Sequence, residues 1–205
     1  MSEMNRKDFL KGMVGTAAMA AMGVPALVLG EDSAEVSELD KQIAKDAIRE
    51  QINNYCLCMD RLDRELGYNL FTKECRYEFE RTFSGTGYEF VDKCLDEWHP
   101  FMINTAHRML NMKIAVDSAT TARSHTYGLM HSLTKDAEGK YTMSYNEVRY
   151  CDKWVKQEDG VWRICDRQGV VDWYCNIPVD AWAEPELSTR IDKKDPFYTL
   201  FPEFI

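Results

Sequence analysis

The chain has 205 residues, a formal net charge of −9 and a pI of about 5.0, with 45% hydrophobic and 29% charged residues. This composition supports one folded domain with appendages and excludes a predominantly disordered chain. Because no basic stripe is interleaved with aromatic residues, the sequence also argues against a nucleic-acid partner.

Residues 1–35 are typical of a targeting segment, with a charged start, an uncharged run over residues 13–29 and a polar end. The start resembles a twin-arginine export signal, although Lys7 stands where the second arginine belongs. The matching positions are Arg6, Phe9, Leu10 and Lys11. We therefore expect export to the periplasm or cell surface, with transient membrane contact through the leader. The alternative is a membrane anchor or a disordered leader on a cytoplasmic protein.

The first part of the mature chain is predicted to be mainly helical. Apolar residues recur at three- and four-residue steps over residues 36–66, with Ser37 as the N-cap and Gly67 as the break. Residues 68–75 resemble a short helix running into a strand, and residues 75–83 alternate as a strand does. A turn at SGTG and a helix over residues 88–98 follow.

The second half is predicted to be a sheet. Alternating segments at 106–117, 119–133, 141–157 and 161–174 are joined by tight turns and indicate an antiparallel meander. Helices followed by strands predict an α+β cone, in which a strongly curved antiparallel sheet packs on helices and encloses an apolar pocket. The expected domain spans residues 36–174, and residues 175–205 form an aromatic-rich tail lying on the body, with Trp182 among its covering side chains.

The seven cysteines contain no CxxC pair, and their odd number prevents complete pairing within one chain. In YCLCMD, Cys56 and Cys58 diverge by roughly 200° around a helix, so they cannot clamp one metal ion. We predict that most of the cysteines pack in the core, as free cysteine commonly does. A single disulfide remains open, and no metal site is predicted.

Three stretches resemble the SnoaL-like branch of the nuclear-transport-factor-2-like (NTF2-like) superfamily. They are YCLCMDRLD with LFTKECRYEF, HRMLNMKIAVDSATTARSHTY, and YCDKWVKQEDGVWRICDR. Within the superfamily, the chain is most similar to scytalone dehydratases, bile-acid 7α-dehydratases and hexachlorocyclohexane dehydrochlorinases, over about residues 40–174. The resemblance implies an NTF2-like barrel without a cofactor. It also implies a homodimer or homotrimer built through the exposed side of the sheet.

The family pattern has a tyrosine five residues before an aspartate at the end of the first helix, and a histidine opening a later strand. Here these are Tyr55, Asp60 and His107, with the family's I-x-V/I-D stretch in register at Ile114 to Asp117. The resemblance implies that His107 is a base oriented by Asp60, and that Tyr55 donates to an enolate oxygen. From the residues alone, a core tyrosine, a surface aspartate and a structural histidine are the alternatives.

The candidate substrate-binding residues are Tyr77, Phe79, His125 and Tyr127. The first two share the strand face expected to line the pocket, and the other two contact a ligand if they point inward from the central strand. His99 is expected in a loop or at the surface.

Bile-acid 7α-dehydratases carry a further carboxylate and an arginine, but the register places Met130 and Val171 at those positions. Residues that could substitute for them are Arg149, Asp152, Arg163 and Asp172. The leading hypothesis is therefore a dehydratase acting on a hydrophobic polycyclic or aromatic hydroxy-carbonyl compound, such as a steroid or bile-acid derivative. The alternatives are a non-catalytic binding or assembly module, and an isomerase that uses the same pocket.

Overall fold

The computed structural model describes residues 36–180 and 195–204, so the expected leader and Trp182 lie outside the described ranges. In chain order the elements are α1 (Glu38–Arg61), α2 (Arg64–Asn69), β1 (Phe71–Phe79), β2 (Phe83–Thr86), α3 (Gly87–Lys93), the π-helix η2 (Cys94–Trp98), the 3-10 helix η3 (His99–Phe101), β3 (Met102–Val116), β4 (Thr121–Lys135), β5 (Tyr141–Lys156), β6 (Trp162–Val179), α4 (Pro196–Leu200) and the 3-10 helix η4 (Pro202–Phe204).

The strands form one six-stranded sheet in the order β2-β1-β6-β5-β4-β3. As the alternation predicts, β3 to β6 form an antiparallel meander. However, β1 pairs with β6 in parallel, with Tyr77 opposite Arg167 and Phe79 opposite Gly169. The predicted α+β cone is confirmed, but its sheet is mixed rather than purely antiparallel, because β1 covers the open edge that the last strand of the meander leaves.

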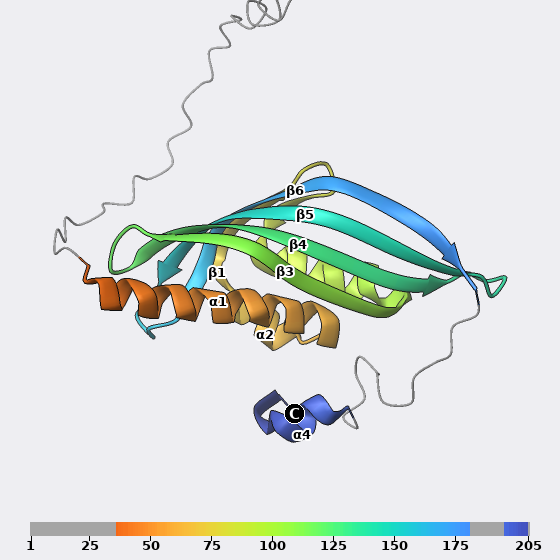
Figure 1. Ribbon diagram of the computed structural model, residues 1–205, viewed down its shortest axis with the longest axis horizontal. Helices are drawn as coiled ribbons and strands as arrows, with labels where there is room; N and C mark the ends of the chain where they lie inside the picture. The colour runs from red at the N-terminus through yellow and green to blue at the C-terminus, as the bar shows by residue number, and fades with distance from the viewer. Residues whose placement is uncertain (1–35, 181–194, 205) are drawn as a thin grey trace, which may run out of the picture. The chain divides into compact units, whose positions relative to one another are not determined.

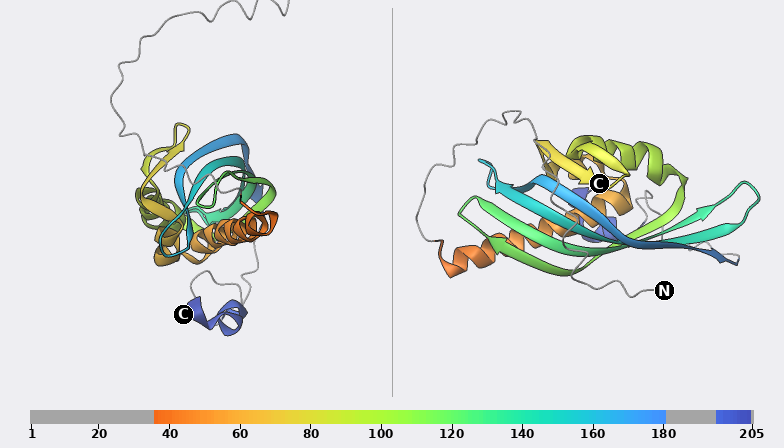
Figure 2. Two further views of the ribbon diagram at one scale, coloured as in Figure 1. Left: turned by 90° about the vertical axis from the view of Figure 1, so that its left-hand side faces the viewer. Right: turned by 90° about the horizontal axis from the view of Figure 1, so that it is seen from above.

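The sheet is strongly curved and the helices lie on its concave side. Figure 1 shows α1 running alongside β3, and the end-on view in Figure 2 shows the sheet curling around the helices. Register shifts between Met109 and Met112 and between Glu147 and Val148 interrupt the ladders. Such bulges bend a strand and increase its twist, which helps the sheet to enclose a cavity.

Helix α1 ends at a defined point that places the candidate residues. Ser37 is its N-cap, as predicted, and its hydroxyl accepts a hydrogen bond from the backbone N–H of Asp40. The predicted single helix over residues 36–66 divides because Leu62 adopts a left-handed conformation (φ 56°) and its N–H bonds the carbonyl of Cys58. Asp60 therefore lies in the last turn of α1.

The core fills the space between the concave face and the helices. Every second residue of the central strands points inward, so Val148, Tyr150, Asp152 and Trp154 of β5 are all buried.

The SGTG sequence, predicted as a turn, forms most of β2 and pairs with β1. None of the helices in residues 36–180 and 195–204 combines the length and the hydropathy needed to cross a membrane.

The end of the chain also differs from the expectation. Strand β6 continues to Val179, so residues 175–179 belong to the sheet rather than to a tail. Asp195, the N-cap of α4, forms a salt bridge of 2.6 Å with Arg61, whose guanidinium lies 5.0 Å from the centre of the Phe197 ring.

Candidate functional site

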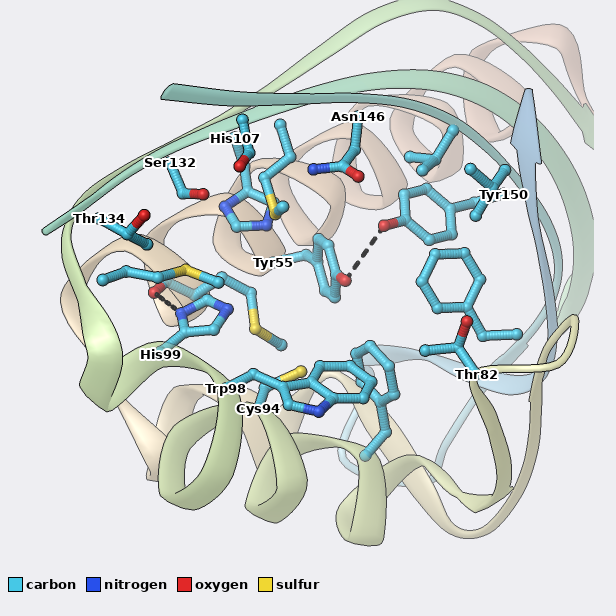
Figure 3. A pocket seen from close by; sticks show the side chains of 18 of the residues that line it. Tyr55, Thr82, Cys94, Trp98, His99, His107, Ser132, Thr134, Asn146 and Tyr150 are labelled. Carbon is cyan, nitrogen blue, oxygen red and sulfur yellow. Dashed lines mark hydrogen bonds between the residues drawn. The ribbon is translucent and has the colours of Figure 1, made fainter. Parts of the chain in front are cut away.

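A cavity of about 350 Å³ lies between the concave face of the sheet and the helices α1, α3 and η2 (Figure 3). Its size is at the lower end of the range for small-molecule sites. It is lined by Tyr55, Met59, Phe79, Thr82, Phe90, Cys94, Trp98, His99, Met102, His107, Met130, Ser132, Thr134, Ser144, Asn146, Val148, Tyr150, Val171 and Asn176. Within the described part of the chain, this lining contains no Asp, Glu, Lys or Arg.

The polar groups of the cavity wall form two separate regions. One is a row across three strands, in which Ser132 faces Ser144 and Ser144 faces Asn176. The Ser144 hydroxyl donates to the Asn176 side-chain oxygen at 2.7 Å. The other region contains the histidine and tyrosine side chains near the end of α1. A ligand in this cavity therefore meets hydrogen-bonding groups on an otherwise apolar surface.

The sequence-predicted pair of His107 and Asp60 is in direct contact. The His107 Nδ1 atom lies 2.7 Å from Asp60 Oδ1. The same carboxylate accepts the backbone N–H of His107 at 2.9 Å and the hydroxyl of Thr105 at 2.9 Å. Asp60 thus links the end of α1 to β3, and the three donors fix its orientation. The His107 side chain is 5% exposed and that of Asp60 is 22% exposed.

This geometry defines the chemistry of His107. A carboxylate at Nδ1 holds the proton on that nitrogen, so the lone pair of the neutral imidazole is on Nε2. The carboxylate also stabilises the imidazolium that forms when Nε2 takes a proton. Because His107 lines the cavity, the pair is arranged as a base for a bound ligand.

Tyr55 is both a core residue and a residue of the cavity wall. Its ring is 2% exposed and stands edge-on to the His107 imidazole, with 6.0 Å between ring centres. Its hydroxyl lies 3.3 Å from the hydroxyl of Tyr150, as the dashed line in Figure 3 shows. Burial raises the pKa of Tyr55 well above its usual value, so the hydroxyl keeps its proton at neutral pH.

His99 was predicted to lie in a loop or at the surface, and this prediction was wrong. It is 3% exposed, it lines the cavity, and its ring is nearly parallel to that of His107 at 5.9 Å. Its Nδ1 atom is 3.1 Å from the carbonyl oxygen of Met59. The proline after His99 suggested a loop, but η3 folds this segment back against the last turn of α1.

Of the four predicted substrate-binding residues, one lines the cavity and three do not. Phe79 lines the cavity. Tyr77 points to the same side but is fully buried, stacked on Phe90 with 4.0 Å between ring centres, and it does not reach the lining.

His125 and Tyr127 lie on the opposite face of β4, so the condition for their contact with a ligand, that they point inward, is not met. The reason is the phase of the strand, because Thr126 and Met130 take the inward positions. His125 instead borders a groove on the outer face, beside Lys113 and Arg123.

Met130 and Val171 line the cavity, at the positions where the family register placed them. Of the substitutes considered, Arg149 and Asp172 pair with each other at 2.8 Å, and neither lines the cavity. Arg163 pairs with Asp159. None of these charged groups replaces the missing carboxylate and arginine inside the cavity.

Sequence reasoning missed Tyr150 and a buried ion pair behind it. Arg167 donates to Asp152 through Nε at 2.7 Å and through Nη2 at 2.9 Å. The guanidinium carbon lies 4.7 Å from the ring centre of Tyr55 and 4.5 Å from that of Tyr150. The alternation of β5 places Tyr150 and Asp152 on one face, and this pattern was the available signal.

The cysteines do not form the site. All seven are free thiols, but only Cys58, Cys75 and Cys94 are buried, so the prediction that most of the cysteines pack in the core was wrong. Three others are partly buried, and Cys151 is exposed. Burial raises the pKa of Cys58 and of Cys75 to about 12, so these thiols are poor nucleophiles. Across the described ranges, no three His, Cys, Asp or Glu side chains gather as metal ligands would.

Comparison with solved structures finds the same fold. A type 2 hexachlorocyclohexane dehydrochlorinase is 16% identical with a TM-score of 0.62, and the match covers 73% of this chain and 99% of that chain. A candidate scytalone dehydratase from Novosphingobium aromaticivorans is 22% identical with a TM-score of 0.60, covering 71% and 95%. A type 3 dehydrochlorinase from Novosphingobium barchaimii is 16% identical with a TM-score of 0.61, covering 73% and 100%.

At these identities the structural matches show the shared NTF2-like fold. A search of curated protein sequences found no match. The family model of the SnoaL-like domain matches residues 42–168, which is more than half of the chain and includes Tyr55, Asp60 and His107. The chain therefore belongs to the SnoaL-like domain family.

Proposed function

We propose that this protein is a cofactor-independent dehydratase, a carbon–oxygen lyase that removes water from a hydrophobic hydroxy-carbonyl compound with one or more rings. The proposal rests above all on the 2.7 Å contact between His107 and Asp60 at the wall of a largely apolar cavity. The reactions named for the structural neighbours, dehydrochlorination and scytalone dehydration, are eliminations and support the same class.

Elimination beside a carbonyl needs a base, an oxygen-stabilising donor and a proton for the leaving group. His107 Nε2 takes the α-proton, and Asp60 stabilises the imidazolium that results. The Tyr55 hydroxyl donates a hydrogen bond to the oxygen that becomes negative as the enolate forms. The enolate then expels the β-hydroxyl, which leaves as water with the proton from His107.

The cavity also limits the substrate. With about 350 Å³ of space and an uncharged lining in the described residues, it favours a compact, neutral, ring-containing compound. The row formed by Ser132, Ser144 and Asn176 supplies hydrogen-bonding partners for a hydroxyl or carbonyl group elsewhere on the molecule.

The same observations weigh against a purely non-catalytic module. Such a module has no need to place a histidine and a carboxylate within hydrogen-bonding distance at a cavity wall. An isomerase remains the nearest alternative, because it uses the same base without expelling an oxygen. The mass of the product separates the two reactions.

The test is a screen of hydroxysteroids, bile acids and phenolic hydroxy-acids for products that have lost the mass of one water. His107→Ala should abolish turnover while the thermal melting curve stays cooperative. His131→Gln is the matched control, because His131 lies on the outer face of β4 and its variant should keep full activity. Full activity of His107→Ala on an identified substrate rules out the assignment, and a product of unchanged mass indicates an isomerase.

A further inference from the structure

The ion pair of Asp152 and Arg167 is buried behind the cavity and joins β5 to β6. Asp152 is 3% exposed and Arg167 is 2% exposed. Removing two charges from water is costly, and a buried pair is often no more stabilising than well-packed apolar residues of similar size. Arg167 Nη1 is also buried without a hydrogen-bond partner among the described residues. A role beyond stability therefore deserves consideration for this pair.

The charge of Arg167 is directed towards two tyrosines of the site. Asp152 accepts two hydrogen bonds from one edge of the Arg167 guanidinium. The central carbon of the guanidinium lies 4.7 Å from the ring centre of Tyr55 and 4.5 Å from that of Tyr150. Both distances are within the range of cation–π contacts. The rings of Tyr77 and Phe71 are further away, at 5.6 Å. Positive charge therefore lies directly behind the two tyrosines that line the cavity.

While they are bonded to each other, the hydroxyl groups of Tyr55 and Tyr150 can together donate one hydrogen bond to a ligand. They are 3.3 Å apart, so one donates to the other and the second O–H bond is directed elsewhere. A hydroxyl that accepts one hydrogen bond becomes a stronger donor of the next. Burial raises the pKa of Tyr150 to about 12, so both hydroxyls stay protonated, although the charge of Arg167 acts in the opposite direction.

We propose that Tyr150 is a further catalytic residue, which joins Tyr55 in a two-tyrosine oxyanion site, and that the Asp152–Arg167 pair is a positioning element that supplies positive charge behind this site. The inference deepens the proposed dehydratase function and rests on it. As His107 takes the α-proton, the C–H electrons form the enolate C=C bond and the carbonyl oxygen becomes negative. As that charge develops, each hydroxyl turns its O–H towards the oxygen, so Tyr55 and Tyr150 both donate a hydrogen bond to it and both keep their protons.

The enolate then returns its electrons, the C–O bond to the β-hydroxyl breaks, and the departing oxygen takes the proton from the His107 imidazolium. His107 and Tyr55 are neighbours at the cavity wall, with ring centres 6.0 Å apart. The base and the oxyanion donors can therefore reach adjacent atoms of one substrate. Figure 3 shows Tyr55 between His107 and Tyr150, as this arrangement requires.

The test measures binding of a stable oxyanion and needs no turnover. The probes are 4-nitrophenol, whose ionised form is coloured, and 4-nitroanisole, which has the same ring without an ionisable oxygen. The wild type should bind 4-nitrophenolate and lower the apparent pKa of the bound phenol. Tyr150→Phe should weaken phenolate binding by about tenfold or more, since a hydrogen bond to a charged group is lost. Binding of 4-nitroanisole should not change.

Two further variants separate the hydroxyl from the charge. Tyr77→Phe is the matched control: its ring also contacts Arg167, but Tyr77 is fully buried and does not line the cavity. It should bind both probes as the wild type does. Asp152→Leu with Arg167→Met removes both charges without leaving one unpaired, and should abolish the preference for phenolate over 4-nitroanisole.

The proposal is overturned if the wild type does not bind 4-nitrophenolate, or if Tyr150→Phe binds it as tightly as the wild type. Retention of the phenolate preference by the double variant overturns the role of the ion pair. If the double variant does not fold, as judged by circular dichroism, Tyr150→Phe decides alone. Loss of turnover in His107→Ala combined with unchanged phenolate binding in Tyr150→Phe keeps the dehydratase and removes the oxyanion assignment.

Discussion

Replacing Asp60 by asparagine should slow the reaction about 10³- to 10⁴-fold without unfolding the protein. Three donors converge on this carboxylate: the Thr105 hydroxyl, the backbone N–H of His107 and His107 Nδ1, all within 2.9 Å. Asparagine has one acceptor oxygen and one NH₂ group. The Thr105 hydroxyl and Nδ1 both contact Oδ1, whereas the backbone N–H is closest to Oδ2. If the amide oxygen takes the Oδ2 position and keeps the backbone N–H, the NH₂ group takes the Oδ1 position and faces Nδ1, and the imidazole must carry its proton on Nε2.

The magnitude follows from two contributions. The charge-assisted hydrogen bond between the imidazole and the carboxylate contributes about 1.5–3 kcal/mol. Attraction between an imidazolium and a carboxylate about 4 Å apart adds roughly 4 kcal/mol at an effective dielectric constant of about 20. These contributions overlap, so we expect about 4–6 kcal/mol in the activation free energy, which corresponds to the stated range of rates.

The assay combines turnover with long-range ¹H–¹⁵N NMR of the histidines. In the wild type, the neutral His107 imidazole should carry its proton on Nδ1, and in Asp60→Asn on Nε2. Thr105→Val removes a single neutral donor and should slow the reaction no more than about tenfold. Turnover by Asp60→Asn within tenfold of the wild type, or an unchanged tautomer, refutes the assigned role of Asp60.

Three other predictions concern stability and reactivity. Because burial raises the pKa of Tyr150 from 10.0 to about 12, its contribution to stability is complete below pH 10, and about 3 kcal/mol is lost as the pH rises through 12. Urea unfolding of Tyr150→Phe should show a smaller alkaline loss, and equal losses contradict this. At pH 8, iodoacetamide should label the exposed Cys151 well before the buried Cys75, whose pKa is about 12; equal labelling by mass spectrometry is the contrary result. Gly169→Ala places a Cβ atom 2.3 Å from the Phe79 ring and should lower the free energy of unfolding by about 1–3 kcal/mol. Thermal unfolding should show this as a fall in Tm, and an unchanged Tm contradicts the prediction.

The sequence predicted the local elements and the contact between Asp60 and His107 well, for physical reasons. The meander has a period of two that any single strand displays, and α1 has its capping serine and its apolar face within one segment. Asp60 and His107 were found because the family pattern relates two residues that are 47 positions apart in the chain. Periodicity alone left both of them with structural alternatives.

The predictions that failed depend on how distant parts of the chain pack together. The inward or outward direction of His125 depends on the phase of β4 against the core, and a one-residue change of phase reverses it. The parallel pairing of β1 with β6 leaves no local trace, because each strand alternates in the same way with either neighbour. Arg167 and Tyr150 meet only through that global arrangement, so no short segment of sequence indicated their contact.

The pairing of β1 with β6 also has a consequence for how the protein is made. Tyr77 and Arg167 are opposite each other in the sheet but 90 positions apart in the chain. Contacts between such distant residues raise the contact order and slow folding. During synthesis, Tyr55, Asp60 and His107 emerge long before β6 does. A nascent chain that ends before residue 162 contains the proposed base and its carboxylate, but its aromatic side chains still lack the strand that covers them, and this intermediate is where aggregation should compete with folding.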